Sequence, residues 1–181
     1  MLKTSRVYGY AEKIQMGWLN QISGMLQQYA GGSGQTGNAE QDYQQVAQHA
    51  PPSAVAPGLS DAFRSDKTPP FGQMVSSMFG QSNGDQRAGI LNQLIQSVGP
   101  GALAGLGGGL LSKLGGGGSI TPEQAQQVSP QDVQVLADHA QKHDPSVIDR
   151  AGEFYAQHPT LVQGLGAGAL ALIMSRMSQN R

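Results

Sequence analysis

Hydrophobic residues recur along much of this chain at steps of three and four, the spacing that places them on one face of an α-helix. The clearest stripe lies within residues 16–30, and further stripes lie at 71–79, 90–98 and 147–155. The first stripe comprises Trp18, Leu19, Ile22, Met25, Leu26 and Tyr29. No segment alternates apolar and polar residues as a half-buried strand does. The pattern predicts an all-α fold of roughly eight to ten short helices.

Pairs of a capping residue and a proline mark the starts of several predicted helices. A Ser, Thr or Asp side chain accepts a hydrogen bond from the first helical turn, and proline suits the first helical position. Such pairs are Thr68-Pro69, Thr121-Pro122, Ser129-Pro130 and Asp144-Pro145. A helix is expected to begin near each of these prolines, and His158-Pro159 predicts a last helix that runs through Met177.

Glycine-rich stretches divide the chain. They lie at 31–38 and in a Gly/Leu-rich segment at 99–119, and their composition is typical of flexible linkers. The expected order is an N-terminal amphipathic helix at 16–30, a linker at 31–38, helical subdomain 1 at 39–98, the Gly/Leu-rich linker at 99–119 and helical subdomain 2 at 120–181. The conformation of the Gly/Leu-rich segment stays open, because glycine disfavours helix.

The two predicted subdomains carry a faint internal repeat, with an offset of roughly 80 residues that drifts by several positions. Gln44-Gln45-Val46 resembles Gln126-Gln127-Val128, Pro52 with Val55 resembles Pro130 with Val133, and Asp66 ahead of Pro69 resembles Asp144 ahead of Pro145. Duplication of one unit and chance similarity between two Gln-rich helical segments both stay open.

Composition excludes several classes of protein. The 181 residues include 11 basic and 12 acidic ones, for a formal net charge of -1, and no run of Lys or Arg offers a footprint for nucleic acid. Cysteine is absent, which excludes disulfides, thiolate nucleophiles and cysteine-ligated zinc. Residues 1–15 lack the apolar stretch of a signal peptide. Since Met16 reads as a second start, they are a candidate upstream extension, and a cytoplasmic location is expected.

Charge is segregated along the chain. Residues 16–39 and 154–175 contain no Lys, Arg, Asp or Glu, and residues 88–122 contain only Lys113. These three segments are expected to cover one another, bind a second copy or meet a membrane. Gly164 and Gly168 have the small-xxx-small spacing of helices packed backbone to backbone. The predicted contact residues are Trp18, Leu19, Ile22, Met25, Leu26, Tyr29, Leu161, Gly164, Leu165, Gly168 and Leu172.

Two patterns suggest chemistry, and each has a structural explanation. The pentad Gly80–Gly84 matches the G-x-S-x-G nucleophile elbow around Ser82, but the residues before it fit a helix where the elbow needs a strand. A corner between two helices, with Ser82 or Asn83 capping the second, explains the pentad without chemistry. His139 and His143 lie four apart, as zinc ligands on a helix do, but no third ligand is placed. The carboxylates Asp132, Asp138, Asp149 and Glu153 look like solubilising charges. We therefore expect no catalytic residues and no cofactor.

Three segments together resemble a known family. They are Met16 to Leu19 leading into a short helix, the Gly/Leu tract Gly99 to Gly118, and Ile120-Thr121-Pro122-Glu123-Gln124. This combination resembles the bacterial YidB-like group, small helical proteins of uncharacterised function. The helical block at 40–98 departs from that pattern, and the resemblance implies no active site.

The sequence thus predicts a non-enzymatic helical scaffold or self-association module, whose partner is a second copy or another helical protein. One alternative is a membrane-surface protein that uses the Gly/Leu tract and the last helix. A second alternative is a small hydrolase at Ser82 or a metal-binding protein at His139 and His143.

Overall fold

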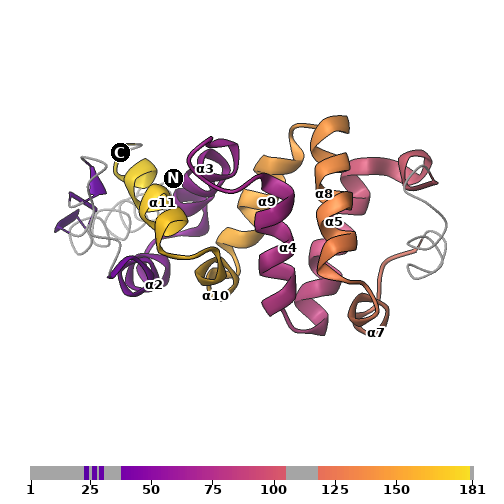
Figure 1. The fold of residues 1–181 in the computed structure, drawn as a ribbon. Coiled ribbons are helices and arrows are strands. Elements are labelled where there is room, and N and C mark those ends of the chain that lie inside the picture. The colour runs from indigo at the N-terminus through magenta and orange to yellow at the C-terminus, as the bar shows by residue number, and fades with distance from the viewer. Residues whose placement is uncertain (1–22, 25, 28, 31–37, 105–117, 180–181) are drawn as a thin grey trace, which may run out of the picture.

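The computed structural model describes residues 23–24, 26–27, 29–30, 38–104 and 118–179. Over these residues the chain forms nine α-helices, one short 3-10 helix and no strand, so the all-α prediction is confirmed (Figure 1). The elements are α2 (Ala39–His49), α3 (Pro52–Arg64), α4 (Phe71–Gln81), α5 (Gly84–Ala104), α7 (Pro122–Gln126), α8 (Pro130–His143), α9 (Val147–Ala156), α10 (Pro159–Val162), η2 (Gln163–Leu165) and α11 (Ala167–Gln179).

Two of the predicted helix starts are confirmed in full. Thr121 caps α7, where its side chain accepts a hydrogen bond from the Gln124 backbone N–H and the Gln124 side chain accepts one from the Thr121 N–H. Ser129 and Asp132 make the same reciprocal pair at the start of α8. Each pair satisfies two backbone donors that the first turn leaves without a helical partner.

The Thr68-Pro69 prediction is wrong about what the threonine caps. The Thr68 hydroxyl donates to the carbonyl of Ala62 at 2.6 Å, at the end of α3, and α4 begins only at Phe71. The physical reason is the second proline, Pro70, because a residue that precedes proline is pushed into extended conformation. At the Asp144-Pro145 pair, Asp144 instead accepts hydrogen bonds from Ser146, and α9 begins two residues later than Pro145.

Glycines with positive φ interrupt the helical path at two places. Gly166 has φ 82° and separates η2 from α11, so the single last helix expected from Pro159 to Met177 is interrupted. Gly99 has φ 74° and bends α5 where the Gly/Leu-rich segment begins. Glycine adopts these angles without the steric cost that any other residue meets.

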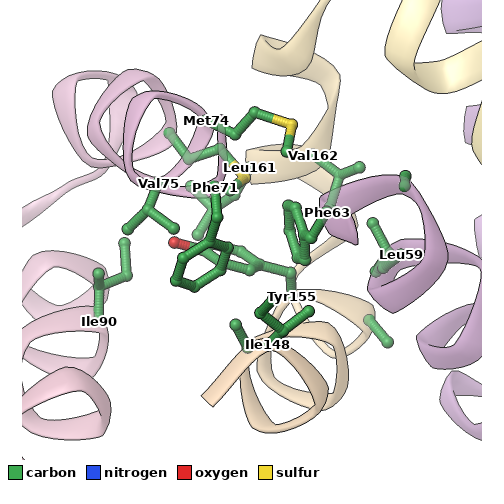
Figure 2. Packing of buried hydrophobic residues seen from close by; sticks show 14 of the residues in the cluster. Leu59, Phe63, Phe71, Met74, Val75, Ile90, Ile148, Tyr155, Leu161 and Val162 are labelled. Atoms are coloured by element: carbon green, nitrogen blue, oxygen red, sulfur yellow. The ribbon is translucent and has the colours of Figure 1, made fainter. Parts of the chain in front are cut away.

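One hydrophobic core runs through both predicted subdomains. Helix α3 packs on α9 and α11, whereas α4 packs on α8 (Figure 1). The ring centroid of Phe63 on α3 lies 5.5 Å from that of Phe71 on α4 and 5.9 Å from that of Tyr155 on α9. Figure 2 shows these three rings gathered in the core. The Gly/Leu-rich segment therefore divides the sequence but does not divide the core.

Three helix crossings are close because a glycine lies in each. A Cβ on Gly152 of α9 would lie 2.9 Å from the carbonyl oxygen of Ala56 on α3. A Cβ on Gly72 of α4 would lie 2.9 Å from the carbonyl oxygen of Gln134 on α8. At the crossing of α3 with α11, the Cβ of a residue replacing Gly58 would meet α11 backbone and side-chain atoms. The core depends on these short distances between helix backbones.

The side chain of Asn92 on α5 fastens the chain just before α7. Its Oδ1 accepts from the backbone N–H of Ile120 at 2.7 Å, and its Nδ2 donates to the Ile120 carbonyl at 3.2 Å. Ile120 is only 5% exposed, so both backbone groups lack ready access to water. The Asn92 amide thereby fixes the position at which the second half of the chain joins the core.

Replacing Asn92 with alanine is expected to lower the free energy of unfolding by about 2 kcal/mol, because both backbone groups of Ile120 lose their partner. Urea denaturation followed by circular dichroism measures the change. Asn92→Asp serves as the matched control: it retains the acceptor and loses the donor, so its loss should be smaller than that of alanine. Equal stability of Asn92→Ala and the parent chain would contradict the role of the clamp.

Candidate functional site

The predicted contact surface at the N-terminal end is covered by the chain itself wherever it is described. Leu26 and Tyr29 are 1% and 2% exposed and belong to the common core. The Tyr29 hydroxyl donates to Asp42 of α2 at 2.8 Å. The other predicted residues, Trp18, Leu19, Ile22 and Met25, lie outside the described residues. Leu26 and Tyr29 are therefore packed within one molecule and not presented to a partner.

The predicted contact residues near the C-terminus fall into two groups. Leu161 is 4% exposed and belongs to the core. Gly164 is covered by the Gln81 side chain, whose amide atoms would lie within 2.6 Å of a Cβ at that position. Gly168 is exposed, and no atom of the described residues lies within 4 Å of where its Cβ would be. Of the two glycines of the small-xxx-small pair, Gly164 is thus covered by the chain itself and Gly168 is open.

Around Gly168 the outer side of α11 is apolar and partly exposed. Leu165, Ala171 and Leu172 are half-buried and pack against the edge of the core. We call Gly168, Ala171 and Leu172, together with Leu165 at the end of the preceding η2, the α11 face. The first charged residue of α11 is Arg176, in the last turn of the helix. The inner side of α11 is fully used, since Leu170, Ile173 and Met174 are buried and the helix packs on α3 and α2.

A groove of about 710 Å³ lies between α3 and α9. Arg64 spans part of it and donates from both terminal nitrogens to Asp149 at 2.8 and 2.7 Å. These hydrogen bonds hold the pKa of the Asp149 carboxyl below its usual range. Asp61 and Glu153 also line the groove. Asp149 is held ionised and ion-paired, which suits fastening α9 to α3 and not proton transfer.

The histidine pair lies on α8 as the spacing predicted, with the two ring centroids 4.8 Å apart. In the described ranges no group of three or more His, Cys, Asp or Glu side chains is placed to hold a metal ion. The Nε2 atom of His139 is buried and finds no hydrogen-bond partner among those residues. A pair without a further ligand does not make a zinc site of the usual coordination number.

The pentad around Ser82 forms the corner between α4 and α5 and does not have the strand-to-helix geometry of a nucleophile elbow. The residues before Ser82 belong to α4, where a nucleophile elbow requires a strand. The Ser82 hydroxyl donates to the Met78 carbonyl at 2.7 Å and is buried. Asn83 and Gln86 then exchange hydrogen bonds of 2.9 and 3.0 Å that cap α5, as the helical interpretation of this corner expects.

Arg87 was not singled out by its sequence context, yet it organises the same corner. Its Nε donates to the carbonyls of Phe79 and Ser82, and its Nη2 donates to that of Gly80. The guanidinium carbon also lies 4.9 Å from the centre of the Phe79 ring. These contacts satisfy carbonyls that the end of α4 leaves free, so Arg87 is a structural residue.

Comparison with family models, with curated protein sequences and with solved structures gave no match. The similarity to the YidB-like group therefore stays a prediction. Within the part of the chain that the structure describes, no helix combines the length and apolar character needed to cross a membrane. The fold class that the geometry defines is all-α, and among the described residues the α11 face is a partly open apolar surface.

Proposed function

We propose that this chain is a non-enzymatic helical scaffold that associates with a second copy of itself through the α11 face. The observation that carries the proposal is the open position of Gly168 beside half-buried leucines on an uncharged helix side. A helix of a second copy could approach the α11 backbone closely there, and the leucines would lose contact with water. The same face on both copies is the usual arrangement of a two-fold dimer.

The proposal also accounts for the chain lacking charge between residues 154 and 175. The inner half of this segment fills the core, and the outer half needs no charge if a second copy covers it. A cytoplasmic location and the similarity to the bacterial YidB-like group belong to the same proposal.

Substitution of Leu172 by glutamate is expected to weaken self-association at least 10-fold, because a buried unpaired carboxylate at the interface is unfavourable. Sedimentation velocity over a concentration series measures the monomer–dimer equilibrium. Val135→Glu is the matched control, since Val135 is 55% exposed on α8 and lies outside the α11 face. Its equilibrium should match that of the parent chain.

Gly168→Ala separates a folding defect from a lost interface. The added methyl meets no atom of the described part of the chain, and alanine favours helix, so the variant should fold at least as stably as the parent. It should nevertheless associate more weakly, since the methyl stands where the second backbone approaches. A parent chain that stays monomeric throughout the series would contradict the proposal, and flotation with anionic vesicles would then assign the face to a membrane surface.

A further inference from the structure

The packing of the helices repeats itself between the two halves of the chain. Let α2, α3, α4 and α5 be matched in order with α7, α8, α9 and α11. Then α3 packs on α9 as α8 packs on α4, α3 packs on α11 as α8 packs on α5, and α2 packs on α11 as α7 packs on α5. When each helix is replaced by its match in the other half, each of these packed helix pairs becomes the corresponding pair. The contacts between the two subunits of a two-fold dimer have the same property.

The two central crossings correspond residue by residue. Gly152 on α9 packs against the carbonyl of Ala56 and the side chain of Ser60 on α3. In the other half, Gly72 on α4 packs against the carbonyl of Gln134 and the side chain of Asp138 on α8. The carbonyl oxygen lies 2.9 Å from the Cβ position in both cases.

The register of these crossings agrees with the repeat in the sequence. The spacing from Ala56 to Gln134 equals the spacing from Ser60 to Asp138. The same spacing separates Pro52 from Pro130, Val55 from Val133 and Asp66 from Asp144. Val55 and Val133 are both buried, at 1% and 0% exposure. Sequence similarity and three-dimensional contact thus select one alignment of α3 with α8, which chance similarity does not require.

We propose that residues 39–98 and 122–179 are two copies of one helical unit, and that a second copy of the chain is able to supply either unit. The closest helix contacts join one unit to the other, and the units are linked only through residues 99–121. Contacts of this kind are equally well made between two molecules that exchange units. This route goes beyond the proposed function, because it does not use the α11 face.

The chain concentration during folding decides whether the two units pack within one chain or are exchanged between two chains. Linkage in one chain gives the units an effective concentration of about 1 mM, so a dilute chain closes on itself. Exchange requires the shared core to open, so the exchanged dimer forms when chains refold together at a comparable concentration. The surface is the face on which the two units meet, centred on the crossings of α3 with α9 and α4 with α8, and the partner is an identical chain.

A cross-linking experiment tests the exchange. The chain has no cysteine, so introduced thiols react alone. Arg64→Cys is placed in one copy and Asp149→Cys in a second, because these half-exposed side chains of α3 and α9 contact each other. Both copies also carry Leu172→Glu, which is expected to weaken association through the α11 face. They are unfolded in urea, refolded together at about 1 mM and treated with a short bis-maleimide.

The expected result is a covalent heterodimer that is absent when the copies are mixed without unfolding. Ser65→Cys with Lys67→Cys is the matched control pair, since these neighbours belong to the same unit and stay in one copy after exchange. A chain that carries both Arg64→Cys and Asp149→Cys should cross-link internally when dilute, which shows that the geometry permits the reaction.

Two results would overturn the exchange. One is internal cross-linking of the double variant without any heterodimer in the refolded mixture. The other is equal heterodimer formation by the control pair, which would mark the association as non-specific. Neither result tests the proposed association through the α11 face. That association is tested separately, by sedimentation of native chains without the Leu172→Glu substitution.

Discussion

Replacement of Gly152 by alanine is expected to lower the free energy of unfolding by about 2 to 3 kcal/mol. The new Cβ would lie 2.9 Å from the carbonyl oxygen of Ala56 and would also press on the Ser60 hydroxyl. A backbone carbonyl cannot rotate away as a flexible side chain does. Helices α3 and α9 would have to separate, and the rings of Phe63 and Tyr155 between them would lose contact.

The chain offers both a duplicate and a control for this experiment. Gly72→Ala should lose a similar amount, because its Cβ would meet the Gln134 carbonyl at the same distance. Gly80→Ala lies in the same helix as Gly72, but its Cβ would be 3.8 Å from the Pro130 side chain, an ordinary contact. That variant should gain up to about 1 kcal/mol from helix propensity. Urea midpoints that coincide for Gly152→Ala and Gly80→Ala would show that the crossing is not close.

Alkaline pH is expected to unfold this protein steeply once the pH passes about 10, the usual tyrosine pKa. Burial, followed by the hydrogen bond to Asp42, raises the pKa of Tyr29 to about 12. Burial alone raises the pKa of Tyr43 and that of Tyr155 further above the usual value. In each case the folded state binds the phenolic proton more tightly than the unfolded state does.

The sign of the pH dependence follows from that difference. The stabilisation is complete below pH 10 and is lost as the pH rises from there through each folded-state pKa, because the unfolded chain ionises first. Each tyrosine contributes a slope of up to about 1.4 kcal/mol per pH unit. Urea denaturation between pH 9 and pH 12, with absorbance at 295 nm to follow ionisation, measures the loss.

Tyr155→Phe should reduce the slope of the free energy of unfolding against pH by the contribution of one tyrosine. The Tyr155 hydroxyl has no hydrogen-bond partner among the described residues, so the substitution should leave stability at pH 7 unchanged or higher. A native chain whose tyrosines all titrate near pH 10 without loss of structure would contradict the burial of these three rings.

Local features of the fold could be predicted because they depend on neighbouring residues. The helical stripes, the caps at Thr121 and Ser129 and the Asn83 corner each involve residues a few positions apart. Thr68 shows the limit of such reasoning, since the motif was present but the second proline moved the start of α4.

The shared core could not be predicted from the stripes. An amphipathic helix requires a partner for its apolar side, but the pattern does not say which helix supplies it. Glycine has a low helix propensity, but Gly72 and Gly152 lie where helices from opposite halves of the chain pack closely. Their role depends on Gln134 and Ala56, which are distant in sequence.

The candidate site was predicted in part for the same reason. Leu26, Leu161 and Leu172 look alike in an uncharged stripe, yet the first two are buried within the chain and Leu172 is half-buried at its surface. Charge segregation identifies segments that avoid water. It does not distinguish burial in the chain's own core from burial against a second molecule.

The amide clamp between Asn92 and Ile120 has a consequence for protein engineering. Because the clamp anchors the polypeptide on the far side of the glycine-rich stretch, the length of that stretch has little influence on where α7 begins. Doubling a loop costs only about 0.6 kcal/mol in closure entropy. A fluorescent tag or a whole folded domain inserted into this glycine-rich stretch should leave the helical fold intact.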